Sequence, residues 1–448
     1  MKAGAISGPD FELSEGMTKS LVLVRRICLG LAGLMMLSGC IVKDDTAKKT
    51  AADSAALAAA ALPDTTDISV PAYDSVSADT VGLGSQMVDT ATLGTDSSLT
   101  RLTPRAVEGK PGTFPLRVPS RGATALQLQI LLDRANFSPG IIDGTWGGNA
   151  AKALQWFRVA NGLDSAASPT DSATSTSRGA KTSKGKPSRA AAALASIDKA
   201  VYDKLVGSTD LSSLITSYQI TADDVKGPFV TIPNSVYDQA KLTCLCYSSP
   251  AEELAERFHT SEQLLSQLNP GVDLKTLSAG SSIQVPNVQA FAPPGSSAST
   301  PSSVSPPVTA IGQVAKLIIS RKGYWTHAVD SAGNIVDHFP STLGAGYDPS
   351  PSGDFHVTGV SQNPAFHYQP ALMAEVPDSR PTARLKPGPN SPVGVVWMAL
   401  SKPHYGIHGT SSPQTIGYAN SHGCVRLTNW DAEKLASLIK AGTPVEFQ

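Results

Sequence analysis

The sequence lacks an excess of charge of either sign. Its 36 lysines and arginines are balanced by 37 aspartates and glutamates, which leaves a net charge of −1 over 448 residues. A chain without a basic field has little to attract the phosphates of DNA or RNA, so we predict that nucleic acid is not a partner. A length of 448 residues also exceeds that of one ordinary domain and predicts several folded units.

Cysteine is scarce as well, with five in the whole chain. These are too few and too unevenly spaced for the disulfide framework of a small secreted domain. Cys244 and Cys246 form a C-x-C pair, and residues i and i+2 point to the same face of a strand. Because no further metal ligands stand nearby, apolar packing is favoured, with a local disulfide as the alternative. Cys424 stands alone beside histidines, which is more typical of a nucleophile.

The apolar run near the N-terminus, ICLGLAGLMML, is far shorter than the ~20 residues that a membrane-spanning helix needs. Basic residues precede it, so it is typical of a secretory signal peptide at 1–40. Its end, Leu37–Cys40 (LSGC), resembles the lipobox of bacterial lipoproteins. The resemblance implies an acylated Cys40 and an exported protein of the periplasm or cell envelope that is anchored to a membrane; an ordinary signal peptide is the alternative. The polar character of 1–16 leaves Met17 as an alternative start.

Two segments contain few large apolar side chains. Residues 41–105 are rich in Ala, Ser, Thr and Asp, and cannot bury enough surface to offset the entropy of the chain, so they predict a disordered tether. Residues 289–311 are rich in Pro, Ser and Ala and predict a semi-extended linker.

Residues 106–208 are predicted to form a small helical domain. Four apolar residues share one helical face: Leu128, Leu131, Leu132 and Ala135. The stretch LQILLDRANFSPGIIDGTWGGNAAKALQWFRVANGL resembles the three-helix peptidoglycan-binding domain of cell-wall enzymes, whose D-G-x-x-G loop matches Asp143, Gly144 and Gly147. The glycines are expected to allow positive φ in a tight loop. An insertion at about 165–190 departs from the family pattern, and a helical spacer that binds nothing is the alternative.

Residues 209–288 resemble a LysM module, a βααβ fold that binds aminosugar polymers in its known members. A helix is expected after the cap Ser249, with Pro250 in its first turn, and Ile283–Pro286 reads as a short strand. The resemblance requires a first strand, for which the best segment is Leu242–Tyr247.

Residues 312–448 predict a mostly β domain. Alternating and β-branched runs mark five strands: VAKLIIS, WTHAV, NIVDHF, DFHVTGV and VVWMAL. One helix follows them, capped by Thr428 or Asn429 and ended by Gly442.

The segment His408–Leu427, HGTSSPQTIGYANSHGCVRL, combines two histidines with the last cysteine. Zinc is one reading of His408, His422 and Cys424, but no carboxylate in the segment would orient the histidines, which disfavours a metal site. A thiol nucleophile with a histidine base is favoured, and the glycines permit a loop that folds back. The spacing does not decide which histidine is the base. A packed thiol beside buried histidines is the remaining alternative.

SHGCVRLTNWDAEKLASLI, with HYGIHGT upstream, resembles the signature of bacterial L,D-transpeptidases with a YkuD-type catalytic domain. The resemblance implies that His408 is the general base, oriented by the carbonyl of Gly409, and that Cys424 is the nucleophile. The other roles that it implies are loop support by Ser421 and His422, oxyanion N–H groups from Gly423 and Cys424, and a position near the bound peptide for Arg426. It implies no cofactor and no metal.

The implied reaction is acyl transfer through a thioester, from a peptidoglycan stem tetrapeptide to the side-chain amine of another stem, with release of D-alanine and formation of a 3→3 crosslink. Peptidoglycan stem peptides and glycan are therefore the expected partners, and carbapenem-type β-lactams the expected inhibitors. Transfer to water would make the protein an L,D-carboxypeptidase, and transfer to a protein lysine a lipoprotein-attaching enzyme. A catalytically inactive wall-tethering lipoprotein is the alternative from another class.

Overall fold

The computed structural model describes five ranges with side chains, together with the backbone of 67–69: 102–163, 196–207, 211–292, 314–373 and 376–448. The predicted signal peptide with Cys40, the insertion at about 165–190, most of the tether and nearly all of the linker lie outside the described residues. All features below belong to the unit 62–448. Within the described ranges, no helix combines the length and apolar character that a bilayer crossing requires.

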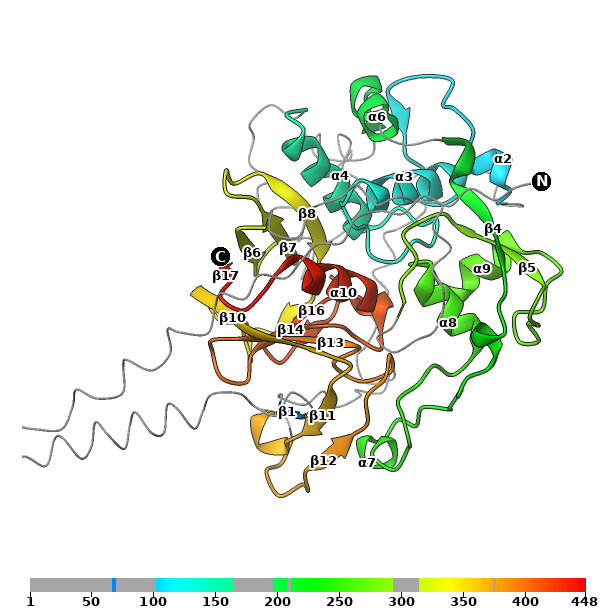
Figure 1. Cartoon of the computed structure of the whole chain (residues 1–448). Helices are drawn as coiled ribbons and strands as arrows, with labels where there is room; N and C mark the ends of the chain where they lie inside the picture. Colours follow the sequence, from blue (N-terminus) through cyan, green and yellow to red (C-terminus); the bar gives the residue numbers. More distant parts are fainter. Residues whose placement is uncertain (1–66, 70–101, 164–195, 208–210, 293–313, 374–375) are drawn as a thin grey trace, which may run out of the picture. The chain divides into compact units, whose positions relative to one another are not determined.

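The C-terminal part, which comprises the described residues from 314 to 448, is built on an eight-stranded sheet (Figure 1). The five strand segments predicted from sequence all form strands of this sheet, which confirms them. In spatial order its strands are β16 (Val425–Arg426), β14 (Gly406–His408), β13 (Val396–Leu400), β10 (Gly353–Gln362), β17 (Pro444–Phe447), β6 (Lys316–Ser320), β7 (Trp325–Val329) and β8 (Ile335–Pro340). Neighbours are antiparallel except for the pairs β14 with β16 and β17 with β6. The last strand of the chain, β17, thus lies in the middle of the sheet.

Short pairs of strands flank this sheet. β9 (Leu343–Gly344) pairs with β15 (Asn420–Ser421), and β11 (Ala365–Tyr368) pairs with β12 (Ala383–Leu385) and with β1 (Asp67–Ser69). β1 falls inside the segment predicted as a disordered tether, as do the first residues of α2 (Pro104–Val107). Two 3₁₀ turns complete this part, η4 (Pro370–Leu372) and η5 (Pro413–Thr415).

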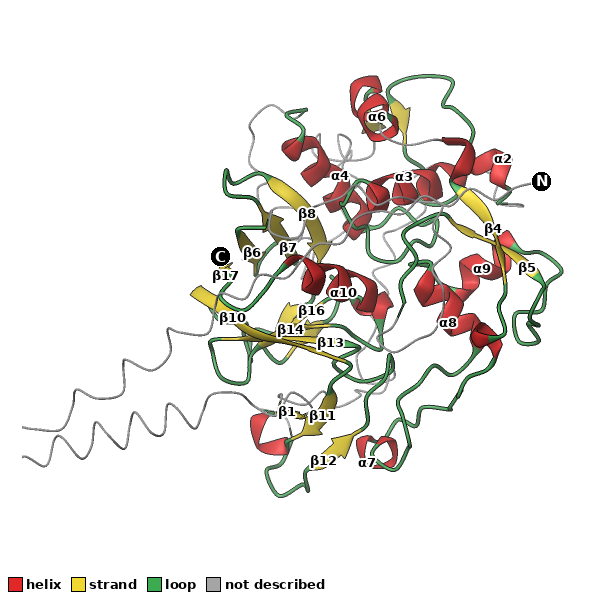
Figure 2. Ribbon diagram, in the orientation of Figure 1, coloured by secondary structure: helices red, strands yellow, loops and turns green. Residues whose placement is uncertain are grey.

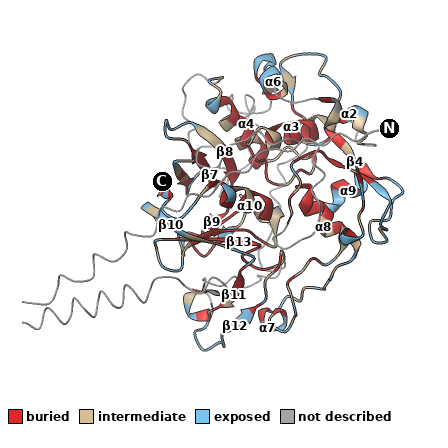
Figure 3. Cartoon of the chain, viewed as in Figure 1, coloured by how far each residue is buried: buried red, intermediate tan, exposed pale blue. Residues whose placement is uncertain are grey.

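The helix α10 (Asn429–Leu438) lies against β13 and β14 (Figure 1). Thr428 is its N-cap, with a side-chain oxygen that accepts from the Asp431 N–H, as expected for that residue type. The helix ends at Leu438, four residues before the predicted end, because Ile439 adopts an extended backbone. Figure 3 shows the buried residues running through α10 and β13, where the core of this part lies.

The N-terminal part, which comprises the described residues from 102 to 292, contains most of the remaining helices (Figure 2). Its first elements are β2 (Leu116–Arg117), α3 (Ala123–Arg134), α4 (Gly148–Ala160), β3 (Ser196–Ile197) and α6 (Lys199–Val206). In the D-G-x-x-G loop between α3 and α4, Gly144 has a φ of +72°, as expected. Gly147 does not: its φ is −99°, and a Cβ there would lie 2.8 Å from the hydroxyl of Tyr418, so this glycine admits a neighbouring side chain.

In the following segment, two adjacent helices lie between two paired strands, with additional elements before them, and the first strand differs from the predicted one. β4 (Ile215–Gln219) pairs with β5 (Ser282–Pro286), and α8 (Pro250–Arg257) and α9 (Glu262–Leu268) stand between them. The segment Leu242–Tyr247, predicted as the first strand, has no strand partner. The segment between β4 and α8 holds η3 (Asp223–Val225) and α7 (Val236–Gln239), and η2 (Leu211–Ser213) precedes β4.

Cys244 and Cys246 are joined by a disulfide, so the prediction of apolar packing was wrong and its alternative holds. The residue between them is held by backbone hydrogen bonds instead of a sheet: Leu245 N donates to Pro387 O at 3.0 Å, and Leu245 O accepts from Asn390 N at 2.9 Å. Leu245 is fully buried against the C-terminal part. The segment predicted as a strand therefore serves as a contact between distant parts of the chain.

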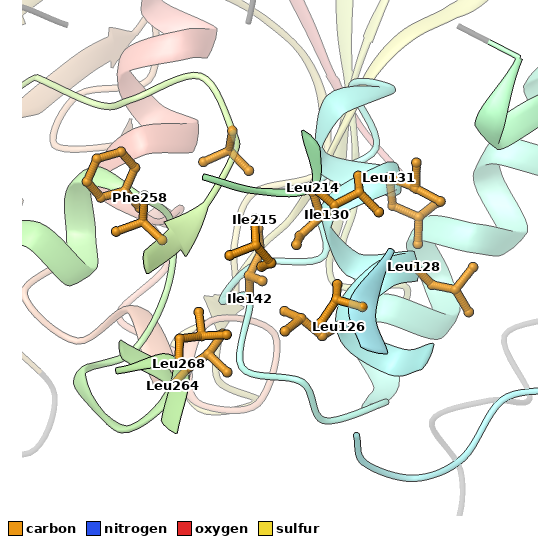
Figure 4. Packing of buried hydrophobic residues seen from close by; sticks show 14 of the residues in the cluster. Leu126, Leu128, Ile130, Leu131, Ile142, Leu214, Ile215, Phe258, Leu264 and Leu268 are labelled. Carbon is orange, nitrogen blue, oxygen red and sulfur yellow. The ribbon is translucent and has the colours of Figure 1, made fainter. Parts of the chain in front are cut away.

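The two helical segments share one hydrophobic core. Figure 4 shows side chains of α3 facing those of β4 and α9. The labelled members are Leu126, Leu128, Ile130, Leu131, Ile142, Leu214, Ile215, Phe258, Leu264 and Leu268. Burial of each large aliphatic side chain contributes about 1.5–3 kcal/mol, so neither segment keeps its apolar surface covered without the other.

A buried polar junction joins this helical region to α10. Ser138 Oγ donates to Asp431 Oδ2 at 2.8 Å, and the ring of His259 stacks on Trp430 with centroids 5.2 Å apart. The same histidine contacts Asp133 of α3 through Nδ1 at 3.0 Å. Three segments that are far apart in the sequence therefore meet at the start of α10.

Asp431→Asn should stabilise the protein more at pH 8 than at pH 5. Burial, with a smaller contribution from Asp133, raises the pKa of Asp431 to about 7, whereas an unfolded Asp titrates near 3.9. The folded state thus binds a proton more tightly, and the stability from this group is lost as pH rises towards 7. Asparagine stays neutral. We expect the advantage of the variant over the wild type to grow by about 2–3 kcal/mol, or about 4–10 °C in Tm, over this range.

The matched control for this prediction is Asp378→Asn, because Asp378 is exposed. Its Tm difference from the wild type should stay constant between pH 5 and pH 8. The pH responses that the wild type and both variants share cancel in these differences, so the comparison isolates Asp431 and its immediate surroundings. A Tm advantage of Asp431→Asn that is constant or falls with pH would contradict the prediction.

Candidate active site

The pairing of β14 with β16 brings together two sequence-predicted site residues. These parallel strands align Ile407 with Val425 and His408 with Arg426. His408 is the last residue of β14, and Cys424 immediately precedes β16. Although sixteen positions separate them in the sequence, both side chains line the same pocket. The loop between the histidine and the cysteine does fold back.

The pocket is small and its lining is mixed. His422, Arg426 and the apolar residues Phe366, Pro392 and Val393 complete the wall around His408 and Cys424. Of the predicted residues, Ser421 and Gly409 do not line the pocket, and their hydrogen bonds are described below. Within the described ranges, no group of three or more histidine, cysteine, aspartate or glutamate side chains is arranged to hold a metal ion. The predicted loop residues Asp143, Gly144 and Gly147 do not line the pocket.

The orientation of His408 is fixed by its own neighbour. Nδ1 lies 2.7 Å from the carbonyl oxygen of Gly409. A carbonyl only accepts, so Nδ1 carries the hydrogen and Nε2 carries the lone pair. Burial lowers the pKa of His408 to about 3, and the positive charge of Arg426 acts in the same direction. The imidazole is therefore neutral at physiological pH, with Nε2 able to accept a proton.

Cys424 is a buried free thiol with 5 % of its surface exposed. Burial raises its pKa to about 11, while a backbone hydrogen bond from Gly406 and the charge of Arg426 act in the opposite direction. The thiol contacts the carbonyl oxygen of His404 at 3.8 Å. A thiol with this pKa is protonated at neutral pH, so nucleophilic attack requires a base in the same step.

Comparison with known proteins finds relatives for the C-terminal part of the chain. Residues 293–447 match the model of the YkuD family, the L,D-transpeptidase catalytic domain. The C-terminal part is therefore similar to the YkuD-type L,D-transpeptidase catalytic domain. Proteins of Bacillus licheniformis and Bacillus subtilis that carry the name L,D-transpeptidase YkuD are each 29% identical to this chain, over 44% and 43% of it and over 92% and 89% of their own lengths.

Solved structures give a weaker likeness. The L,D-transpeptidase LdtMt1, solved in complex with imipenem, is 21% identical, with a TM-score of 0.23. The match covers 30% of this chain and 57% of that one. This chain therefore spans somewhat more than half of the length of that solved transpeptidase.

The L,D-transpeptidase domain supports its cysteine loop with two hydroxyl groups. Ser421 Oγ donates to the carbonyl of Cys424. Ser350 Oγ accepts from Gly344 N and donates to Gly423 O, both at 2.8 Å. Sequence reasoning missed Ser350, because this serine lies 73 positions before Gly423 and only the fold brings them together.

Two further residues of the domain were missed. The ring of Tyr405 packs on Gly423, where a Cβ would lie 2.6 Å from Cε1. Asn429, the first residue of α10, accepts from Val395 N at 3.3 Å and from Thr410 N at 3.1 Å. The sequence offered a signal for Asn429, since it was one of two candidate caps of that helix. The cap is Thr428, which leaves the amide of Asn429 free to bind the loop after His408.

Proposed function

We propose that the protein is a peptidoglycan L,D-transpeptidase that forms 3→3 crosslinks by cysteine acyl transfer. The observation that carries the proposal is the pair of side chains in one pocket: a protonated Cys424 thiol and a neutral His408 whose Nδ1–H is held by Gly409 O. A neutral imidazole with a fixed tautomer is what a buried thiol requires as a base. Phe366, Pro392 and Val393 add an apolar surface beside these polar groups.

In the proposed first half-reaction, Cys424 Sγ attacks the carbonyl of the L-centre of diaminopimelate in a stem tetrapeptide, and His408 Nε2 takes the thiol proton. The N–H groups of Gly423 and Cys424 stabilise the tetrahedral oxyanion. As the C–N bond breaks, the imidazolium gives its proton to the leaving D-alanine amine, and a thioester remains.

In the second half-reaction, the side-chain amine of another stem attacks the thioester. His408 takes a proton from this amine and returns it to the departing thiolate, which restores the enzyme. Arg426, whose buried guanidinium lines the pocket, supplies the positive charge that attracts a carboxylate of the stem peptide. His422 also lines this pocket.

The test uses the full-length protein with disaccharide-tetrapeptide and reads the products by mass spectrometry. We expect loss of D-alanine together with a crosslinked dimer, and we expect Cys424→Ala to reduce both to background without lowering Tm. Loss of D-alanine without a dimer would indicate transfer to water. A folded wild-type protein with no turnover would support the wall-tethering lipoprotein.

We also propose that carbapenem-type β-lactams acylate Cys424, because ring opening of the lactam is the same attack by the thiol on a carbonyl. The intact mass should increase by one inhibitor molecule in the wild type and not in Cys424→Ala.

The remaining sequence predictions complete the proposal. A lipid on Cys40 anchors the exported protein in the cell envelope, and the segments 106–208 and 209–288 bring the catalytic domain to peptidoglycan. Asp143 is half-buried, and its Oδ1 accepts from Thr145 N and from the side-chain amide of Gln129, so this carboxylate stabilises its own loop.

A further inference from the structure

The peptide group between Gly409 and Thr410 is hydrogen-bonded on both of its sides. Its carbonyl accepts from His408 Nδ1 at 2.7 Å, and its N–H donates to Asn429 Oδ1 at 3.1 Å. A peptide group is planar, so a partner that fixes the N–H also fixes the direction of the carbonyl. The orientation of the proposed base therefore depends on Asn429.

Asn429 is itself held in one orientation. Its fully buried amide donates from Nδ2 to Glu256 Oε1 at 2.7 Å and to Pro389 O at 3.1 Å. A main-chain carbonyl only accepts, which places Nδ2 on this side and leaves Oδ1 for the backbone N–H groups. The approach is close: a Cβ on Gly394 or Gly409 would lie about 2 Å from Oδ1 (2.0 and 2.2 Å).

Glu256 comes from outside the catalytic domain. It lies on α8, whereas the residues that match the L,D-transpeptidase family begin at 293. The side chain is buried, with 8 % of its surface exposed. Burial raises the pKa of Glu256 to about 8, so a neutral amide is a close substitute for this carboxyl group at neutral pH.

We propose that Glu256 is a positioning residue for the acyl transfer: through Asn429 and the 409–410 peptide, it fixes the ring orientation of His408. The inference rests on the proposed function and adds to it. The segment that contains α8 is then part of the catalytic apparatus, beyond any role in binding the wall. The chain of contacts runs from Glu256 Oε1 to Asn429 Nδ2, from Asn429 Oδ1 to Thr410 N, and from Gly409 O to His408 Nδ1.

Removal of the acceptor is expected to slow the chemical step. Glu256→Leu keeps an apolar side chain in the space but leaves Asn429 Nδ2 with Pro389 O alone, so the amide is held less firmly. We expect kcat for crosslinking and the rate of carbapenem acylation to fall about 10- to 100-fold, as for other partners that orient a functional histidine, with little change in KM. Glu256→Gln retains an accepting oxygen and should recover most of this rate.

A matched control changes the buried polar junction at the start of α10 but leaves the contacts that run from Glu256 to His408 in place. Ser138→Ala removes the buried hydrogen bond to Asp431 at 2.8 Å, and neither residue contacts the 409–410 peptide. We expect this variant to acylate at the wild-type rate. Tm of each variant shows whether it is folded, and Glu256→Ala replaces Glu256→Leu if the leucine variant does not fold.

An NMR measurement separates this inference from the proposed function, because it needs no turnover. The hydrogen-bonded Nδ1–H of His408 should give a downfield proton resonance in the full-length protein labelled with ¹⁵N-histidine, assigned by its absence in His408→Ala. We expect this resonance to broaden or vanish in Glu256→Leu and to persist in Glu256→Gln and Ser138→Ala.

The outcomes are distinct. A wild-type protein that shows the resonance but neither crosslinks nor reacts with a carbapenem would overturn the proposed function. An active wild type, together with a folded Glu256→Leu that reacts as fast as Ser138→Ala and keeps the His408 resonance, would overturn the role of Glu256 alone.

Discussion

Replacement of His408 by alanine is expected to lower kcat/KM for crosslinking by about 10²- to 10⁴-fold, the usual contribution of a general base. The buried thiol of Cys424 has its pKa raised to about 11, so it does not ionise unaided at neutral pH. His408 is the histidine whose Nδ1–H is fixed by a carbonyl, which leaves Nε2 as the accepting nitrogen. Without the His408 side chain, water is the remaining acceptor for the proton of the Cys424 thiol.

His422→Ala is the matched comparison, because His422 lines the same pocket. We expect it to change kcat/KM less than His408→Ala does, and the reverse ranking would contradict the assignment of the base. The pH profile gives a second readout. Burial lowers the pKa of His408 to about 3, so this group stays neutral from pH 8 down to pH 5 and the acylation rate should show no acidic limb near 6.5.

The sequence was most informative where local pattern decides the structure. The five alternating segments form strands, and the cap at Thr428 begins α10. The motif also identified His408 and Cys424 as candidates, although their spacing alone did not choose between two histidines. In the structure, His408 ends a strand that pairs with the strand after Cys424, and its ring is held by Gly409 O.

The misplaced first strand of the LysM-like segment shows what local pattern cannot supply. Ile215–Gln219 and Leu242–Tyr247 both contain the β-branched or aromatic residues of a strand. Which of them pairs with β5 is decided by a partner more than sixty positions away from the first. The Cys244–Cys246 disulfide and the bonds of Leu245 to Pro387 and Asn390 commit the second segment to another contact.

The residues that support the site are even further in sequence from the groups that they contact. Ser350 and Glu256 act on Gly423 and Asn429 from 73 and 173 positions away. Neither residue type is unusual, and no spacing rule connects either residue with the group that it contacts. Their roles exist only because the fold buries polar groups that then require partners.

Gly423→Ala is expected to lower the rate of carbapenem acylation by about 10²- to 10³-fold, the loss typical of removing one oxyanion donor. Gly423 has a φ of +97°, and its added Cβ would lie 2.6 Å from the ring of Tyr405, far inside contact distance. The backbone must therefore move at the residue that precedes the nucleophile. Its carbonyl is also bonded to Ser350, so a shift carries the proposed oxyanion N–H groups out of line.

Backbone strain alone does not account for such a loss, and a second glycine separates the two effects. Gly333, in the turn between β7 and β8, has a φ of +85° with open space around its Cβ position. Gly333→Ala should cost about 1–3 kcal/mol of stability and leave the acylation rate unchanged. If Gly423→Ala lowers Tm by a similar amount yet acylates as fast as Gly333→Ala, the Gly423–Cys424 backbone does not stabilise the oxyanion. A lower acylation rate in Gly423→Ala alone places the effect at the reacting carbonyl.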